Sequence, residues 1–474
     1  MTGSEWLKVL AFVVLFSWYP LSAMHWANVS DPDIWWHMRA GEWMFQNHAI
    51  PHLDPFSVTG GPWVAYSWTF EAFIYQVASR WDLVGIVTYT ILMSLAIIGI
   101  LFRSLRTLTS DFWRAAALTL ITSLTFSRIF SPRPGLFTTL LFVVVLHILL
   151  STERDGRARR LWLLPLVMLA WANIHIQFVY GLFLIGVFAI DPLLSRIIRY
   201  KTDRKIPAST LWLVFAASTL ATLVNPYGIG IYRVISDFAR QPKLYSLVIE
   251  TQPMKFNHFT HYLAIGMVLL AVVMMLRAKR FRPAWIILLA WATASGIHAE
   301  RDVWVLAIVA ATVIADSLSF ASGSERLGSR TRLFGVAGVA VVVLLGLTWI
   351  MPTNKELLSR VSRVFPMGSV AYIHEHKLQG PIFNDFNWGG FLIYTLPDMP
   401  VSIDGRTNVH GQDRIENSWN TWKMGPNWQN DPNLNRANLI IGEPELPLTK
   451  ALAHDSRYRV AFNDGVSVLF VRAQ

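Results

Sequence analysis

Long apolar runs fill the chain as far as Met351, and short polar stretches separate them. A helix needs about 20 apolar residues to cross a hydrocarbon layer of roughly 30 Å, because each residue adds about 1.5 Å. The runs predict eleven spanning helices, at residues 6–24, 82–102, 112–127, 135–151, 161–175, 177–192, 209–225, 261–277, 283–298, 302–319 and 333–351. We expect the first to be retained, since Ser22-Ala23-Met24-His25 is a poor signal-peptide cleavage site.

Basic residues gather on one side when the connecting loops are assigned alternately to the two sides of the membrane. Five successive loops on that side hold Arg103 and Arg106; Arg154, Arg157, Arg159 and Arg160; Arg196, Arg199, Lys201, Arg204 and Lys205; Arg277, Lys279, Arg280 and Arg282; Arg326, Arg330 and Arg332. An excess of Arg and Lys marks the cytoplasmic side. The N-terminus is then cytoplasmic, and everything after Met351 lies outside.

Residues 66–79 are apolar enough to suggest a further span. The segment is only 14 residues long and contains Glu71, so we interpret it as a helix that lies in the outer interface or re-enters it. If it crossed the membrane, every later basic loop would change sides.

The pattern changes after Met351 to that of a soluble α/β domain. Strands are predicted at 381–384, 401–404, 438–442, 458–462 and 467–472, the last two as a hairpin around Asn463-Asp464-Gly465, and helices at 368–377, 413–423 and 448–454. The predicted architecture is therefore an α-helical polytopic membrane domain, residues 1–351, followed by a small extracytoplasmic α/β domain, residues 352–474. Residues 351–365 form the predicted hinge.

Composition agrees with this class and excludes others. The chain is 53% hydrophobic and only 15% charged, which is too apolar for a soluble domain of this length. The net charge is +11, but the basic residues lie in short loops, which indicates membrane orientation and not a nucleic-acid surface. There are no cysteines, so disulfides, thiolate chemistry and cysteine-ligated metals are excluded.

Conspicuous polar residues of the helix ends and loops gather on the predicted outer side. They are Asp31, Asp33 and His37; Arg128 and Arg133; Asn173, His175 and Gln177; Asn225; and His298, Glu300, Arg301 and Asp302. Ionisable groups at membrane depth cost several kcal/mol unless they pair or face a polar cavity. The pattern predicts an outward-facing cavity on which several loops converge.

The stretch Asp31-Pro32-Asp33-Ile34-Trp35-Trp36-His37 directly follows the first apolar run. Asp33 is predicted to cap a helix over 34–46, with His37 one turn later on the same face. Trp35, Trp36 and Trp43 suit a headgroup layer, so this helix is expected to lie along the membrane surface. The alternative is that both carboxylates serve only the local turn and cap.

Other polar groups leave two interpretations open. His48, His52 and Asp54 suggest a metal cluster, but Pro51 prevents a helical pair of histidines, and an ordinary solvated loop is the alternative.

Arg301 between Glu300 and Asp302 fits either a surface ion cluster or a phosphate-binding guanidinium. Arg128 and Arg133 fit either phosphate binding or headgroup anchoring. Trp388, Trp419, Trp422 and Trp428 fit either sugar stacking or core packing.

Several motifs resemble the GT-C superfamily of polyprenyl-phosphate-dependent glycosyltransferases, the class of protein mannosyltransferases and lipid A aminoarabinose transferases. More narrowly, the chain resembles a largely uncharacterised subgroup of bacterial membrane proteins near that superfamily. The matching motifs are Asp31–His37 with Gly41, Ile50-Pro51, Asp54-Pro55-Phe56-Ser57, Trp68-Thr69-Phe70-Glu71, Asn225-Pro226-Tyr227-Gly228, Asn384-Asp385-Phe386-Asn387-Trp388-Gly389-Gly390 and Ile403-Asp404-Gly405-Arg406.

The resemblance implies transfer of a sugar from a polyprenyl-phosphate carrier to a glycan, lipid or protein acceptor at the outer face of a bacterial inner membrane. A first-loop carboxylate, Asp31 or Asp33, would act as general base or hold a divalent cation such as Mg or Mn, with His37 beside it. Arg301, and secondarily Arg128 or Arg133, would bind the donor phosphate. His175, Asn225, Glu71 and His298 are the expected substrate-binding residues.

A transporter or scaffold for cell-envelope polysaccharide assembly is the alternative function. Transporters carry ionisable residues in mid-helix and inverted repeats of broken helices. The helix centres here are almost wholly apolar and no repeat is visible, which favours a one-sided site.

Overall fold

Contacts divide the chain into two compact units. The computed structural model describes residues 1–25, 29–125, 131–200, 205–241, 243–318 and 328–473. Unit 1 comprises Met1–Ala27, Thr88–Gly228 and Val248–Met351, and unit 2 comprises Asn28–Val87, Ile229–Leu247 and Pro352–Gln474. One edge of unit 2 coincides with the predicted boundary at Met351, and the unit also takes in two segments from earlier in the chain.

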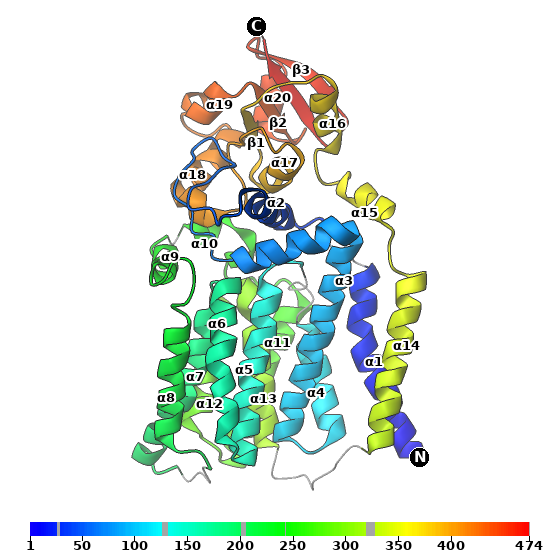
Figure 1. The fold of residues 1–474 in the computed structure, drawn as a ribbon, viewed down its shortest axis with the longest axis vertical. Coiled ribbons are helices and arrows are strands. Elements are labelled where there is room, and N and C mark those ends of the chain that lie inside the picture. Colours follow the sequence, from blue (N-terminus) through cyan, green and yellow to red (C-terminus); the bar gives the residue numbers. More distant parts are fainter. Residues whose placement is uncertain (26–28, 126–130, 201–204, 242, 319–327, 474) are drawn as a thin grey trace. The chain divides into compact units, whose positions relative to one another are not determined.

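Unit 1 is helical (Figure 1). Its helices are α1 (Gly3–His25), the later part of α3 (Trp68–Leu108), α4 (Phe112–Leu124), α5 (Gly135–Asp155), α6 (Leu164–Ile174), α7 (Phe178–Ile197), α8 (Ala208–Ala221), α11 (Phe259–Ala278), α12 (Pro283–His298), α13 (Val303–Ser317) and α14 (Ser329–Trp349), with 3₁₀ turns at Ala158–Leu163, Ile249–Thr251 and Glu300–Asp302. A helix thus lies at each predicted apolar run. Among the described residues, α3, α5, α7, α11 and α14 are long and apolar enough to cross a membrane, and crossing by the others stays a prediction.

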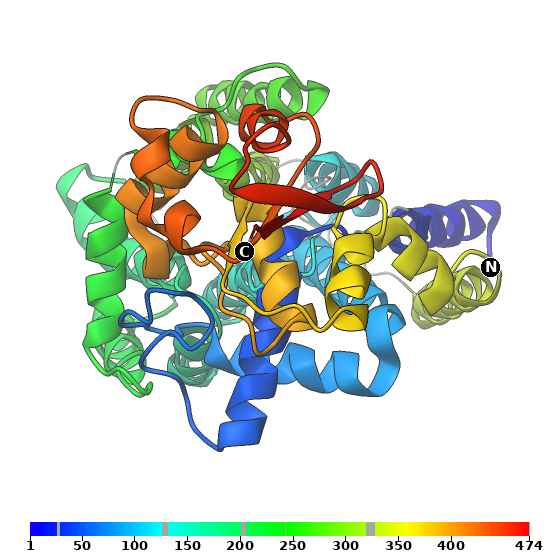
Figure 2. The same ribbon diagram turned by 90° about the horizontal axis from the view of Figure 1, so that it is seen from above.

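Helices α1 and α14 lie side by side in both views of the fold (Figures 1 and 2). Glycines of α14 allow the close approach. A Cβ on Gly338 would lie 2.5 Å from Val13, and one on Gly346 would lie 2.7 Å from Leu21. Small residues at helix contacts are the common packing device in lipid, where no hydrophobic force draws apolar helices together.

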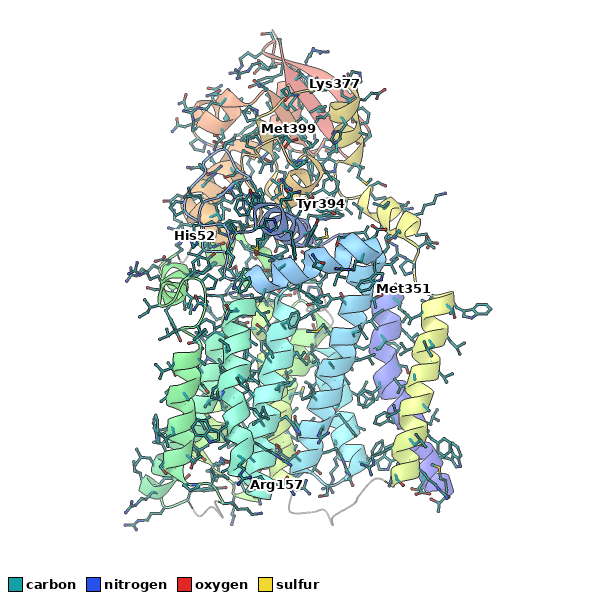
Figure 3. The ribbon with its side chains drawn as sticks, in the orientation of Figure 1. His52, Arg157, Met351, Lys377, Tyr394 and Met399 are labelled. Carbon is teal, nitrogen blue, oxygen red and sulfur yellow. The ribbon has the colours of Figure 1, made fainter. Side chains whose placement is uncertain are left out.

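Arg157 and Met351 mark opposite ends of the unit 1 helices in Figure 3. Near the start of α12, Arg282 pairs with Glu153 at 2.6 Å and with Asp191 at 2.8 Å. Asp191 also accepts the backbone N–H of Ala284 at 3.0 Å. The Asp191 carboxylate thus ties α7 to the start of α12, and Arg282 links both to Glu153 of α5.

Helix α3 bends at Asp82, where φ is 50° and ψ is −147°. Asn354 stabilises the bend. Its amide donates to Asp82 Oδ2 at 3.0 Å, and its Oδ1 accepts the backbone N–H of Val84 at 3.0 Å. The predicted helix at 66–79 is the arm of α3 that precedes this bend, and it belongs to unit 2. Within the predicted hinge, α15 (Asn354–Val361) begins with a capping box of Thr353 and Glu356.

Unit 2 contains a four-stranded sheet. Its strands are β1 (Ile382–Asn384), β2 (Leu439–Gly442), β3 (Tyr458–Asn463) and β4 (Val468–Arg472), in the order β1-β2-β4-β3. β1 and β2 are parallel, and the other pairs are antiparallel. The strands predicted near 381–384, 438–442, 458–462 and 467–472 are thereby confirmed.

The strand predicted at 401–404 is wrong in extent. Only Val401 makes bridges, one to Ile382 of β1 and one to Ser57 of the first outer loop. The backbone N–H of Val58 donates to Val401 O at 3.0 Å, and the N–H of Val401 donates to Phe56 O at 3.1 Å. The pairing stops there because the following residues turn away into a buried ionic cluster.

Short helices complete unit 2. They are α2 (Pro32–Asn47), the first arm of α3, α9 (Gly230–Ala239), α10 (Leu244–Leu247), α15, α16 (Met367–Glu375), α17 (Gly389–Thr395), α18 (Thr407–Trp422), α19 (Pro432–Arg436) and α20 (Pro447–Leu452), with 3₁₀ turns at Phe386–Trp388 and Trp428–Asn430.

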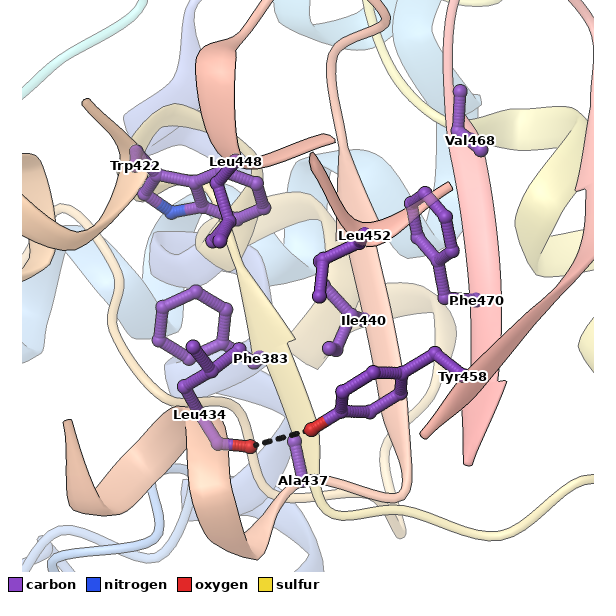
Figure 4. Packing of buried hydrophobic residues seen from close by; sticks show 10 residues of the cluster. All are labelled: Phe383, Trp422, Leu434, Ala437, Ile440, Leu448, Leu452, Tyr458, Val468 and Phe470. Carbon is purple, nitrogen blue, oxygen red and sulfur yellow. Dashed lines mark hydrogen bonds between the residues drawn. The ribbon is translucent and has the colours of Figure 1, made fainter. Parts of the chain in front are cut away.

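An apolar core joins the sheet to these helices (Figure 4). Phe383 of β1 stacks on Trp422 of α18 with ring centroids 5.2 Å apart. Tyr458 of β3 is buried, and its hydroxyl donates to Leu434 O at 3.3 Å. Trp422 therefore packs in the core, which is the second of the two uses that its sequence allowed.

We predict that Trp422→Ala destabilises unit 2 by about 3–5 kcal/mol, because it removes a buried aromatic ring and leaves a cavity. Hydrogen exchange of the β2 and β4 amides in the purified full chain should accelerate accordingly. Met424→Ala, just beyond the same helix and exposed, should leave exchange unchanged. Equal protection in the two variants would contradict the assignment.

Candidate functional site

The first outer loop begins with a capped helix. Asp31 is the N-cap of α2, and its Oδ1 accepts the backbone N–H of Asp33 at 2.9 Å. The prediction that Asp33 forms the cap is wrong. Pro32 occupies the first helical position, where its fixed φ and missing N–H are tolerated, so the residue before it becomes the cap.

Asp33 is half-buried on the first turn of α2. Its Oδ1 accepts the indole N–H of Trp36 at 3.1 Å. The loop Asp404-Gly405-Arg406 passes directly beside this carboxylate, and a Cβ on Gly405 would collide with Asp33 Oδ1. The missing side chain of Gly405 leaves room for this contact, which brings the tail motif against the first-loop motif.

Helix α2 is enclosed by neighbours within unit 2. A Cβ on Gly390 of α17 would lie 2.6 Å from Pro32 O, and one on Gly41 would collide with Glu71 O of α3. Trp35 packs edge-on against Phe391 at 5.1 Å between ring centroids. The surface-lying helix predicted from the tryptophans thus buries Trp35 and Trp36 in protein.

His37 and Glu71 form a buried pair, with Nδ1 and Oε1 3.5 Å apart. Glu71 lies on the arm of α3 that precedes the bend at Asp82. Burial raises the pKa of Glu71 to about 8, and the charge of Arg406 acts in the opposite direction. Two of the predicted site residues are therefore brought together, an imidazole and a carboxyl 3.5 Å apart in a buried place.

Arg406 is a fully buried cation. Its Nη1 lies 2.7 Å from Asp54 Oδ1, and its Nη2 lies 2.6 Å from Asp404 Oδ2. The guanidinium also lies over the rings of Phe56 and Trp63, at 5.0 and 4.7 Å from their centroids. A buried charge needs such compensation, because desolvation costs several kcal/mol per ion.

The Asp404 carboxylate has a second neighbour, His410. The His410 Nε2 lies 3.2 Å from Asp404 Oδ2 and 3.2 Å from the Asp404 backbone N. Burial alone would raise the pKa of Asp404, but Arg406 and His410 outweigh it and hold the pKa well below its usual range.

The Asp54 carboxylate pairs with Arg406 and also accepts hydrogen bonds from its own loop. It accepts the backbone N–H of Phe56 at 3.0 Å and the hydroxyl of Ser57. The metal cluster suggested for His48, His52 and Asp54 finds no support. Throughout residues 1–25, 29–125, 131–200, 205–241, 243–318 and 328–473, no group of three or more His, Asp or Glu is arranged to hold a metal ion.

The tail motif Asn384–Gly390 connects the cluster to the sheet. Asn384 Nδ2 donates to Ile403 O at 2.8 Å, and its Oδ1 accepts the N–H of Ser402 at 3.0 Å. Asp385 caps the following 3₁₀ turn through the N–H of Asn387 at 2.8 Å. Burial raises the pKa of Asp385 to about 6. These hydrogen bonds stabilise the turn before Gly389 and Gly390, which lie close to the backbone oxygens of Ile403 and Pro32.

The remaining predicted residues belong to unit 1. Around the turn Glu300–Asp302, Asp302 accepts the hydroxyl of Tyr180 at 2.7 Å and the amide of Gln177 at 3.0 Å. Glu300 Oε1 lies 3.4 Å from His261 Nε2. Both acids therefore have partners on other helices, and Arg301 between them presents an exposed side chain.

Three further predicted residues make local contacts in unit 1. Arg133 pairs with Glu250 at 2.7 Å, and His175 Nδ1 lies 2.7 Å from Thr138 Oγ1. The Asn225 amide donates to Gly228 O at 3.1 Å and so holds its own turn. Arg128 lies outside the described residues.

His298 lines an apolar groove of about 880 Å³ between α11 and α12. Its walls include Val272, Leu276, Ile286, Leu289 and Ile297. An apolar groove of this kind suits an aliphatic chain. His298 is the last residue of its lining in sequence order, and Arg301 follows three residues later in the chain.

Three solved structures are similar to this chain. An Archaeoglobus fulgidus oligosaccharyltransferase in the apo form has a TM-score of 0.53 at 12% identity, covering 93% of this chain and 69% of its own. The same enzyme tethered with an acceptor peptide has a TM-score of 0.54 at 11% identity, covering 99% and 74%. ArnT from Cupriavidus metallidurans, bound to undecaprenyl phosphate, has a TM-score of 0.50 at 16% identity, covering 100% and 99%.

The chain has the GT-C glycosyltransferase fold. No protein-family model matches the sequence, and no curated protein sequence matches it. Identities of 11–16% establish the fold alone, so the chemistry of this GT-C chain must be argued from its own residues.

Sequence reasoning missed the ionic cluster of this GT-C chain. Asp54, Asp404 and Arg406 were each noticed in a motif, but none was assigned to the others. The signal that pointed to them was the mixture of charged residues and glycine in Ile403-Asp404-Gly405-Arg406, which is unusual beside an apolar strand.

We predict that Arg406→Met destabilises unit 2 by about 3–5 kcal/mol at pH 7, because two buried carboxylates lose their cation. The loss should shrink toward pH 4.5. In the native chain Asp404 has a depressed pKa and contributes stability that is lost as pH falls through that pKa, whereas unpaired buried carboxylates have raised pKa values and regain stability on protonation.

Unfolding midpoints of the purified full chain at pH 7 and pH 4.5 measure both effects. Arg457→Met is the matched control, since Arg457 makes the same two-residue pairing with Asp455 at 2.7 Å but at the surface. The control should change stability by no more than about 1 kcal/mol. A destabilisation by Arg406→Met that grows on acidification would contradict the cluster.

Proposed function

We propose that the protein transfers a sugar from a polyprenyl-phosphate carrier to a hydroxyl or amine of an envelope glycan, lipid or protein, at the outer face of the bacterial inner membrane. The observation that carries the proposal is the GT-C fold, which matches ArnT over 100% of this chain and 99% of that one. That relative is bound to undecaprenyl phosphate, a lipid of the class proposed here as the carrier.

Asp33 is the proposed general base. Asp31 already serves as the helix cap, whereas Asp33 is half-buried on the first turn of α2. The Asp33 Oδ1 accepts the indole N–H of Trp36 at 3.1 Å, and a carboxylate is a group that can accept a proton from an acceptor hydroxyl or amine. His37 and Glu71 support this end of α2 as the buried pair described above.

The proposed step is a single displacement. The acceptor oxygen or nitrogen forms a bond to the anomeric carbon, the bond from that carbon to the carrier phosphate breaks, and the acceptor proton passes to the Asp33 carboxylate. The polyprenyl phosphate leaves with its electron pair and carries the negative charge.

The apolar groove between α11 and α12 supports a lipid donor. Its volume of about 880 Å³ and its aliphatic walls fit part of a polyprenyl chain, and His298 belongs to its lining. His175 and Asn225 remain proposed substrate-binding residues of unit 1, with Arg133 as a second phosphate-binding candidate.

We predict that Asp33→Asn lowers kcat by at least about 100-fold in an assay of sugar transfer from a polyprenyl-phosphate donor, because a general base contributes about 10²–10⁴-fold. Asp31→Asn should retain most activity, since asparagine caps helices about as well as aspartate. Glu42→Gln, later on the same helix, is the control. Full transfer by Asp33→Asn would refute the assignment, and absence of transfer by the unaltered chain with a panel of such donors would favour the transporter or scaffold alternative.

We predict that Arg301→Lys lowers kcat/KM for the donor by about 10-fold or more, because a lysine cannot reproduce the paired hydrogen bonds of a guanidinium to phosphate. Purified protein is titrated with donor at fixed acceptor, and folding is checked by melting temperature. Arg277→Lys, an exposed residue at the last turn of α11, should have no effect. Equal donor kinetics in both variants would remove Arg301 from the phosphate site.

A further inference from the structure

A second pocket lies within unit 2, between one face of α18 and residues 426–433. Its volume is about 590 Å³, within the range of small-molecule sites. The α18 wall consists of Asp413, Arg414, Asn417, Ser418 and Thr421 at helical spacing, and of His410, which precedes the kink at Gly411. Ser402, Ile403 and Phe383 complete the lining next to the sheet.

The two walls of this pocket are tied together by hydrogen bonds. Thr421 Oγ1 donates to Asp431 Oδ2 at 2.7 Å, and Asn420 Nδ2 donates to Pro426 O at 2.8 Å. Asp431 also caps α19 through the N–H of Asn433 at 2.8 Å. The cavity is therefore preformed, which reduces the ordering cost that a ligand must offset on binding.

Three buried polar atoms on the α18 wall have no hydrogen-bond partner in the described part of the chain. They are His410 Nδ1, Arg414 Nε and Ser418 Oγ. His410 and Ser418 are each only 7% exposed. A buried polar atom without a partner costs about 1–3 kcal/mol, and all three atoms belong to residues that line the pocket.

The lining has the chemistry of a neutral, hydroxyl-rich ligand. Side-chain amides are its commonest polar groups, supplied by Asn417, Asn420, Asn427, Asn430 and Asn433. Amides and hydroxyls both donate and accept, as sugar hydroxyls do. Arg414 is the only cation among these lining residues, and Asp413 and Asp431 outnumber it, which disfavours an anion such as phosphate or a carboxylate.

We propose that this pocket binds a neutral saccharide, as a site separate from the residues assigned to sugar transfer. The apolar faces of Pro426 and Pro432 would contact the carbon-rich face of a sugar ring, while the amides and hydroxyls of the lining bond to its hydroxyls. The inference concerns binding alone and does not rest on transferase activity. If the proposed function also holds, the bound saccharide is part of the acceptor glycan.

The test is binding of defined trisaccharides to the purified full chain in a detergent without a sugar headgroup, with no donor present. The neutral probes are cellotriose, maltotriose, mannotriose and tri-N-acetylchitotriose, and trigalacturonic acid is the anionic comparator. We expect saturable binding of at least one neutral probe with a Kd below about 1 mM by isothermal titration calorimetry, and none of the anion. Failure of all four neutral probes at 10-fold higher concentration, or preference for the anion, overturns the proposal.

Variants locate the binding. Ser418→Ala removes the unpartnered hydroxyl without adding bulk, and Asn430→Ala removes an exposed amide with little risk to folding. Each should raise the Kd for the saccharide by about 10-fold. Lys423→Gln, at the C-cap of the same helix but outside the pocket, should leave the Kd unchanged. Unchanged affinity in both pocket variants overturns the proposal. Saccharide binding by a chain that proves inactive in transfer would support it while refuting the proposed function.

Discussion

The rest of unit 2 depends on the ion pairs that the buried guanidinium of Arg406 forms with Asp54 and Asp404. A fully desolvated cation is stable only where carboxylates and aromatic faces surround it. The partners come from residues 350 positions apart, since Asp54 lies in the first outer loop and Asp404 in the tail. Nonpolar packing could tolerate small shifts of these segments, but a paired charge requires its partners at hydrogen-bond distance. The cluster therefore specifies how the first loop and the tail meet.

The contact of these segments depends on glycine as much as on charge. Gly405 passes beside Asp33, Gly390 passes beside Pro32, and Gly41 passes beside Glu71. At each point the space that a side chain would need is taken by a backbone oxygen or by a carboxylate. Helix α2 is consequently held by close backbone contacts on two sides, which positions Asp33 more narrowly than a loop could.

Local pattern predicted much of this fold, and long-range pairing was beyond it. The helices were predicted correctly because the length of an apolar run can be read directly from neighbouring residues in the sequence. The strand at 438–442 and the hairpin around Asn463-Asp464-Gly465 followed from alternation and turn chemistry. The cap was assigned to Asp33 because the N-cap preference of aspartate does not distinguish two nearby acids. Pro32 does distinguish them, since proline favours the first helical position and the residue before it, Asp31, then becomes the cap. The pairings of Arg406 with Asp54 and of His37 with Glu71 could not be predicted, since no local rule relates residues so far apart. Burial of Trp35 was missed for the same reason, because a tryptophan suits a lipid headgroup and a protein core equally well.

The bridge of Val401 to Ser57 also determines how the sheet ends. An exposed edge strand offers unpaired N–H and C=O groups to any other chain and invites aggregation. On one side of this sheet, Val401 covers β1, and residues 56–58 of the first outer loop cover Val401 in turn. On the other side, the register of β3 is interrupted between Val460 and Phe462, and such a bulge discourages further pairing. Residues 56–58 thus protect one edge of the C-terminal sheet from pairing with other chains. A fragment that begins after Met351 would lack these residues and would expose that edge.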